Sequence, residues 1–140
     1  MIRIARDGVV IEMTDEEYAA TWAQPTKAER KTQMLVAVAA RRWRAEEAGT
    51  TLGGNPLATD RNTQAKLTAA YVKAQADPGY VIPNWKYAPG VFGPLDAATI
   101  IAAGDAVTAH VQACFDNEAA LSAAINSAAT HAALDAIDIE

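Results

Sequence analysis

Three residues near the C-terminal end have the side-chain types of a hydrolase triad: Ser127, His131 and Asp135, each four positions from the next. That spacing would place them along one face of a helix. A working nucleophile instead lies on a strained turn beside an oxyanion hole, and its partners converge from separate elements. The sequence contains no Gly-x-Ser-x-Gly motif. We therefore expect no catalytic residues and a protein that is not an enzyme.

His110 and Cys114 are also four positions apart and could share a metal ion. A structural zinc site needs four ligands and a catalytic one three, and the only other histidine is His131. Asp116 and Glu118 would have to be recruited, in a spacing that matches no known zinc motif. We expect no metal here, but a small buried thiol beside a hydrogen-bonded histidine.

The glycine-rich segment Leu52-Gly53-Gly54-Asn55-Pro56 lacks the Lys-Ser/Thr pair of a phosphate-binding loop. It also lacks a dinucleotide-binding fingerprint. We interpret it as a turn between two short extended pieces, and we expect no cofactor.

Arg41-Arg42-Trp43-Arg44 is the one basic cluster. On a helix, Arg41 and Arg44 share a side while Trp43 turns toward the core, and the glutamates that follow partly cancel the positive field. This pattern favours contact with an acidic protein surface, either a partner's or the chain's own C-terminal half, over nucleic-acid binding. Arg41 and Arg44 are therefore candidate partner-contact residues.

Most bulky side chains gather between residues 80 and 94, where Pro89-Gly90 predicts the turn of a short hairpin. Its aromatic residues Trp85, Tyr87 and Phe92 could form an exposed platform that anchors a partner. They could equally close the end of a helical core. Trp85, Tyr87 and Phe92 complete the candidate partner-contact set.

The composition indicates a helical protein with a core of small side chains. The chain has 140 residues, of which 33 are alanine and only 6% aromatic. Alanine has the highest helix propensity, and half the residues are apolar, which excludes a disordered chain. A single cysteine permits no internal disulfide, and no signal peptide or membrane span is recognisable. We expect a protein made in the cytoplasm.

The charge is divided unevenly within a net charge of −5. Residues 1–86 hold 12 basic and 10 acidic residues, whereas residues 87–140 hold 7 acidic residues and no basic ones. An acidic half does not suit a phosphate backbone, so we expect no nucleic-acid partner. The charge asymmetry either helps neighbouring copies or partners to align electrostatically with the chain, or is simply a solvated acidic face.

Local signals predict the elements of the first half. Asp7-Gly8 between two β-type runs predicts a hairpin. Thr14 and Thr26 each begin a capping box, which predicts helices to about residues 24 and 48, the second ended by Gly49. The apolar stripe of this second helix is expected at these residues: Leu35, Val36, Ala39, Ala40 and Trp43.

In the second half, Asp60 is expected to cap a third helix. Asp96 is expected to cap a long fourth helix from residue 97 to about 126, with a further helical turn or two before Glu140. The long helix carries a heptad-like seam, interrupted at Gly104 and Glu118. It would pack against the other helices or form a bundle between copies.

The predicted fold is therefore predominantly α within an α+β class. It comprises a small N-terminal β-hairpin, then a three- to four-helix bundle with a short β-hairpin inserted before the long C-terminal helix. We divide the chain into a lead-in segment, residues 1–25, and a helical domain, residues 26–140.

Residues 38–140, about three quarters of the chain, carry an ordered set of motifs. They are Arg41-Arg42-Trp43-Arg44-x-Glu46-x-x-Gly49, Thr59-Asp60-Arg61-x-x-Gln64-x-x-Leu67-x-x-Ala70-Tyr71, Ala74-Gln75, Trp85-Lys86, Leu95-Asp96-Ala97-Ala98 and His110-Val111-Gln112-Ala113-Cys114-Phe115. With these motifs the chain resembles a family of phage and prophage domains of unknown function, found in tail and tail-fibre-associated proteins of tailed bacteriophages. The segment from Asp7 to Glu17 is similar to the lead-in of such proteins.

The resemblance implies a structural component of the virion, in the tail, baseplate or fibre attachment, that acts by protein–protein contact. It implies other tail, baseplate or fibre proteins as partners and several copies of the chain in the particle. It also implies that Arg61, Gln64, Tyr71, Trp85 and His110 form a buried polar and aromatic framework. The alternative is a tail-fibre assembly chaperone that is absent from the mature virion.

Overall fold

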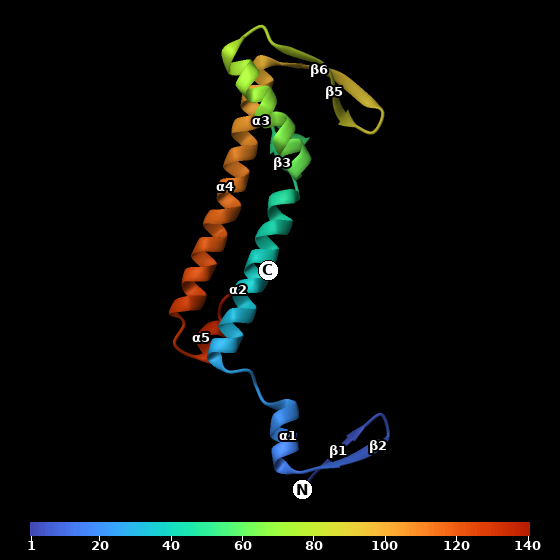
Figure 1. The fold of residues 1–140 in the computed structure, drawn as a ribbon, viewed down its shortest axis with the longest axis vertical. Coiled ribbons are helices and arrows are strands. Elements are labelled where there is room, and N and C mark those ends of the chain that lie inside the picture. The colour runs from blue at the N-terminus through green and yellow to red at the C-terminus, as the bar shows by residue number, and fades with distance from the viewer.

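The computed structural model describes residues 1–140, apart from the side chain of Arg6. It confirms the predicted class, a mostly helical α+β fold (Figure 1). In chain order the elements are β1 (Ile2–Arg6), β2 (Val9–Met13), α1 (Asp15–Trp22), α2 (Lys27–Glu47), β3 (Thr50–Leu52), β4 (Asn55–Leu57), α3 (Arg61–Ala76), β5 (Val81–Ala88), β6 (Val91–Asp96), α4 (Ala97–Ser127) and α5 (His131–Asp135). The strands pair as three antiparallel hairpins, β1–β2, β3–β4 and β5–β6.

The helices begin at the predicted caps. Thr14 and Thr26 each accept a hydrogen bond from the backbone N–H of the glutamate three residues later, and that glutamate bonds back to the cap. Asp60 and Asp96 cap α3 and α4 in the same way, through the backbone N–H of a threonine three residues on. These bonds satisfy N–H groups that lack partners within the helix.

Two glycines mark predicted turns by their left-handed backbone. Gly49 ends α2 with φ +94°, and Gly8 follows Asp7 in the first hairpin with φ +79°. Asp7 itself has φ 52°, so both central residues of the β1–β2 turn are left-handed, as a type I′ turn requires. The Gly53-Gly54 segment is the predicted turn between two short extended pieces, which pair as the antiparallel hairpin β3–β4.

The helix α4 is the spine of the molecule (Figure 1). The helices α2 and α3 lie one after the other along it, and the β3–β4 hairpin lies where the chain passes from one to the other. The heptad-like seam of α4 is therefore used within the chain, since Ile100, Val107 and Ile125 are buried in it.

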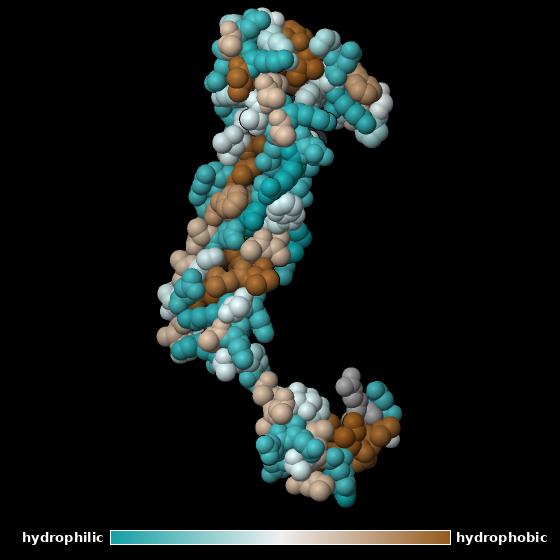
Figure 2. Space-filling view, in the orientation of Figure 1, coloured by the Kyte–Doolittle hydropathy of each residue, from teal (hydrophilic) through white to brown (hydrophobic). Residues whose placement is uncertain are grey.

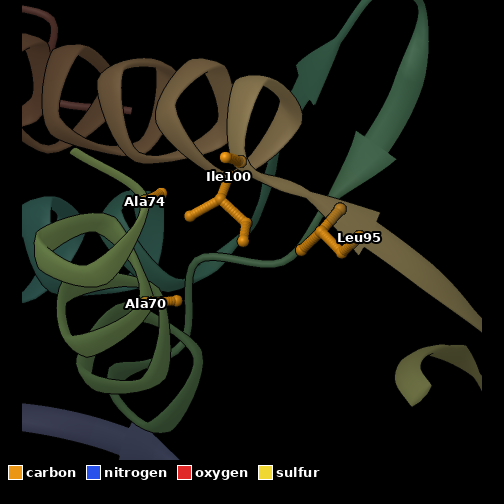
Figure 3. Close-up of a cluster of buried hydrophobic side chains, with 5 residues drawn as sticks. Ala70, Ala74, Leu95 and Ile100 are labelled. Atoms are coloured by element: carbon orange, nitrogen blue, oxygen red, sulfur yellow. The ribbon is translucent and has the colours of Figure 1, made fainter. Parts of the chain in front are cut away.

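The apolar core consists of three small clusters spaced along α4. At the β5–β6 end, Ile100 of α4 packs against Ala70 and Ala74 of α3 and against Leu95 of β6 (Figure 3). The next cluster centres on Leu67, Ala103 and Val107. The third, at the α5 end, joins these residues: Val38, Ile125, Ala128 and Leu134. Alanines let the helices approach closely, as the composition indicates.

The predicted apolar stripe of α2 is partly wrong. Val36 and Trp43 are exposed, whereas Val38 and the charged Glu46 are buried. The helix is rotated relative to the predicted stripe because its buried side carries polar residues that find partners on α3 and α4. A pattern of apolar residues alone misplaces such a helix.

Two parts extend from the helical rod (Figure 1). The N-terminal unit, residues 1–22, follows beyond the α5 end of the rod, and the β5–β6 hairpin projects from the opposite end. Figure 2 shows hydrophobic residues gathered on the N-terminal unit, where Val9, Val10 and Ile11 are exposed. Among the described residues, no helix has the length and apolar character of a membrane span.

Candidate functional site

The triad-like residues Ser127, His131 and Asp135 do not share a helix face. Helix α4 ends at Ser127, whose hydroxyl donates to the carbonyl of Ala124, and the chain leaves the helix before α5 begins at His131. Arg30 of α2 holds the other two, by a hydrogen bond to the His131 carbonyl and an ion pair with Asp135. His131 and Asp135 border a polar hollow of about 540 Å³ that Ser127 does not line. The three side chains have no common reacting centre.

His110 and Cys114 lie where α4 meets the end of α2. The ring Nε2 of His110 is 2.9 Å from the carbonyl oxygen of Ala45, to which it donates, and Cys114 Sγ is 3.8 Å from the same nitrogen. Burial raises the pKa of the Cys114 thiol, and the nearby Glu46 raises it further. Within the described part of the chain, no three His, Cys, Asp or Glu residues are grouped so that they could hold a metal ion.

A partly buried polar network crosses the α2–α4 seam between the apolar clusters. Arg42 donates from Nε to Glu118 at 2.9 Å and from an Nη to Glu46 at 2.6 Å, and the Glu46 side chain is only 5% exposed. The hydrogen bond to Glu118 is the main reason that the pKa of Arg42 rises above its ordinary value. The Glu118 that interrupts the seam is therefore the partner of a cation on the facing helix.

Thr59 is fully buried just before α3, and it links this network to the β3–β4 hairpin that follows α2. Its hydroxyl donates to the Glu46 carbonyl and accepts from the Gly49 N–H at 2.9 Å. The Gln64 amide donates to the Thr59 carbonyl at 2.7 Å and lies 3.5 Å from the Glu46 carboxylate. The network fixes how α2 gives way to α3 along α4.

The prediction that Arg61 belongs to a buried framework is wrong. Gln64, Tyr71, Trp85 and His110 are half-buried, but Arg61 is exposed. Its guanidinium lies 4.4 Å from the centre of the Trp43 ring, which is itself exposed. Arg61 follows the cap at the very start of α3 and points out of the rod, so it is satisfied by a cation–π contact at the surface.

Tyr71 of α3 packs tightly against Gly104 of α4. Its hydroxyl donates to Asp105 at 2.9 Å, and this carboxylate raises the pKa of the phenol. A Cβ atom at Gly104 would lie only 2.5 Å from Cδ2 of the Tyr71 ring. The glycine that interrupts the seam therefore makes room for the tyrosine. Both residues line an open groove of about 440 Å³ between the two helices.

The predicted partner-contact residues lie in two places: the arginines near the end of α2, and the aromatic residues on the β5–β6 hairpin. Arg41 and Arg44 lie near the end of α2, half-buried and exposed respectively. Between them in the sequence, Arg42 is the arginine that lies in the seam, and its guanidinium is 4.5 Å from the centre of the exposed Phe115 ring on α4.

The β5–β6 hairpin divides its aromatic residues between core and solvent. Trp85 packs against two core clusters, whereas Tyr87 and Phe92 are 54% and 59% exposed. Trp85 thus closes the core, and only Tyr87 and Phe92 remain available as a platform. The Tyr87 hydroxyl donates to the Pro94 carbonyl at 2.7 Å across the hairpin, which fixes the ring in place. Pro83, Pro94 and two register shifts interrupt the strand edges.

The polar centre was not predicted as a unit. Glu46 and Thr59 occur within the motifs of the family resemblance, but those motifs assign them no contact, because their partners come from three elements. The one signal that could have found it is the glutamate at a seam position of α4, which requires a cation on a facing helix.

A comparison with family models matches residues 29–139 to a family described as a domain of unknown function (DUF4376). No curated protein and no solved structure matches the chain.

Proposed function

The chain belongs to the family described as a domain of unknown function (DUF4376), and we propose that it is a structural component of a tailed-phage virion that acts by protein–protein contact. Its place is the tail, the baseplate or the attachment of a tail fibre, in several copies. The assignment to phage is supported by the motifs of residues 38–140, which resemble tail and tail-fibre-associated domains.

The observation that carries the contact function is the β5–β6 hairpin. It projects from the rod while Trp85 anchors its base in the core, and it presents Tyr87, Val91 and Phe92 more than half exposed (Figure 1). Aromatic side chains that are held rigidly on a surface anchor a partner at low entropic cost. Since the strand edges are interrupted by prolines and bulges, the hairpin contacts its partner through side chains rather than by strand addition.

Mass spectrometry of purified virions tests the assignment to the particle. We expect the chain in a fixed stoichiometry with the tail proteins. Its absence from particles, with normal expression in the infected cell, would refute the structural role and support the alternative, a fibre assembly chaperone.

A hairpin variant tests the contact surface. In Phe92→Ser we expect the protein to be folded but lost from virions, because an anchor side chain is removed. Val36→Ser is the control, since Val36 is an apolar residue on α2, away from the hairpin, and is at least as exposed as Phe92. Equal incorporation of both variants would show that the hairpin is not the contact.

A further inference from the structure

The N-terminal unit, residues 1–22, contains a two-stranded sheet with little to hold it. None of the residues of α1 is buried, and Val9, Val10 and Ile11 of β2 are 61%, 62% and 40% exposed. A two-stranded hairpin is marginally stable in water, and three or more strands with a shared apolar face are needed for independent stability. The unit therefore has both the apolar surface and the need for additional strands.

Both edges of this hairpin are open, but they differ in charge. No other strand of the described chain pairs with β1 or β2. The sequence of β1 contains two arginines in five residues, and charged side chains on an edge resist strand addition. By contrast, β2 (VVIEM) has one charge, Glu12, and its ion pair with Arg3 offsets the charges of both residues. The strand β2 is also the more exposed apolar one, since its Val9, Val10 and Ile11 are exposed whereas the isoleucines of β1 are half-buried. Hence β2 is the edge suited to pairing.

The register decides which backbone groups of β2 face outward. The two-residue turn closes on the pair Arg6–Val9, and hydrogen-bonded and non-hydrogen-bonded pairs alternate from there along an antiparallel ladder. Val10, opposite Ala5, and Glu12, opposite Arg3, are therefore in non-hydrogen-bonded positions. Their N–H and C=O groups point away from β1, toward the open edge of β2.

We propose that β2 pairs with β2 of a second copy of this chain, antiparallel about a two-fold axis at Ile11, to form a four-stranded sheet. Val10 of each copy then exchanges both backbone hydrogen bonds with Glu12 of the other, and no like charges lie directly opposite. One face of the sheet carries these residues from both copies: Ile2, Ile4, Val9, Ile11 and Met13. The two charged β1 strands become the outer edges, so the assembly closes as a dimer.

This inference deepens the proposed function by assigning the contact between copies, and it rests only on the presence of several copies. The molar mass of the purified full chain tests it in solution without any virion. A monomeric chain in solution would therefore refute the dimer without refuting the role in the virion. Absence of the chain from virions would refute that role without refuting the dimer.

Proline variants at the two edges distinguish the strands. Val10→Pro removes an outward N–H of β2 and Ala5→Pro removes the corresponding one of β1, while neither N–H belongs to the ladder of the hairpin itself. By light scattering over a concentration series, we expect Val10→Pro to raise the dimer dissociation constant about tenfold or more, because both symmetric bonds are lost. Ala5→Pro should leave it unchanged. An equal effect of both, or a monomeric parent chain, overturns the proposal.

Disulfide trapping tests the axis even if a proline variant fails to fold. In a Cys114→Ser background, Ile11→Cys places two thiols at the two-fold axis, in a non-hydrogen-bonded pair whose Cα atoms are about 4.5 Å apart. Val9→Cys is the control, since Val9 is more exposed than Ile11 but is offset from its own copy. We expect oxidised dimer with Ile11→Cys and far less with Val9→Cys. If disulfide formation instead follows side-chain exposure, so that Val9→Cys crosslinks faster than Ile11→Cys, the proposed β2–β2 register is refuted.

Discussion

Replacement of Gly104 by alanine is the perturbation for which local and tertiary considerations predict opposite signs. Gly104 lies inside α4, and alanine is about 1 kcal/mol more favourable than glycine within a helix. On local grounds alone, Gly104→Ala should therefore stabilise the protein.

The packing of α3 on α4 predicts the reverse. The new methyl group would lie 2.5 Å from Cδ2 and 3.1 Å from Cε2 of Tyr71, where carbon atoms prefer about 3.5–4.0 Å. The ring must move by roughly 1 Å, and its hydroxyl then leaves Asp105. Overpacking of this kind costs about 1–3 kcal/mol. Set against the propensity gain of about 1 kcal/mol, we expect Gly104→Ala to lower the free energy of unfolding by up to about 2 kcal/mol.

A double-mutant cycle in urea, followed by helical circular dichroism, measures both terms. In a Tyr71→Ala background the obstruction is gone, so Gly104→Ala should stabilise by about 1 kcal/mol. Ala102→Gly, at an exposed position of the same helix, calibrates the propensity term and should cost about 1 kcal/mol. If Gly104→Ala stabilises the parent chain, or if the sign stays the same in both backgrounds, the close approach of Tyr71 is refuted.

Three further predictions concern the core, a helix cap and the thiol. Ile125→Ala should lower the free energy of unfolding by about 2–5 kcal/mol because Ile125 is fully buried, whereas Val36→Ala should change it by less than about 0.5 kcal/mol in the same urea titration. Hydrogen bonds from Thr63 lower the pKa of Asp60. The ionised Asp60 carboxylate therefore stabilises the fold at pH values above the ordinary carboxylate pKa, and this stabilisation is lost as the pH falls through the lowered pKa. Asp60→Asn keeps the cap, and its stability should fall less than that of the parent chain between about pH 5 and 2; parallel acid titrations would contradict this. Burial raises the pKa of Cys114, so iodoacetamide should alkylate it more slowly than free glutathione at pH 8 and at a comparable rate in denaturant; equal rates in the native chain would show the thiol to be accessible.

The order and limits of the helices could be predicted from the sequence because the forces that set them act over three or four residues. Thr14 and Glu17 form a capping box whatever the rest of the chain does, and the same is true of Thr26 and Glu29. Asp7-Gly8 likewise selects its turn from backbone sterics alone.

The candidate site could be predicted only in part. Trp85, Tyr87 and Phe92 were identified by residue type, but which of them is buried depends on how β5–β6 meets α3 and α4. Gln64, Tyr71 and His110 do take part in polar contacts between elements, whereas Arg61 lies on the surface with Trp43.

Which side of α2 faces α4 depends on contacts between elements that are far apart in the sequence. By its sequence, α2 offers Trp43 to the core and its arginines to solvent. In the folded chain Arg42 and Glu46 enter the seam because Glu118, 76 residues after Arg42, lies opposite them on α4. The desolvation of a charge is offset by a specific partner. Pairing across such a distance depends on how the helices pack, and its one trace in the sequence is Glu118 at a seam position of α4, with no matching pattern in α2. The sequence alone determined an alanine-rich set of capped helices and tight hairpins, and the tertiary contacts decided which of their polar residues are buried.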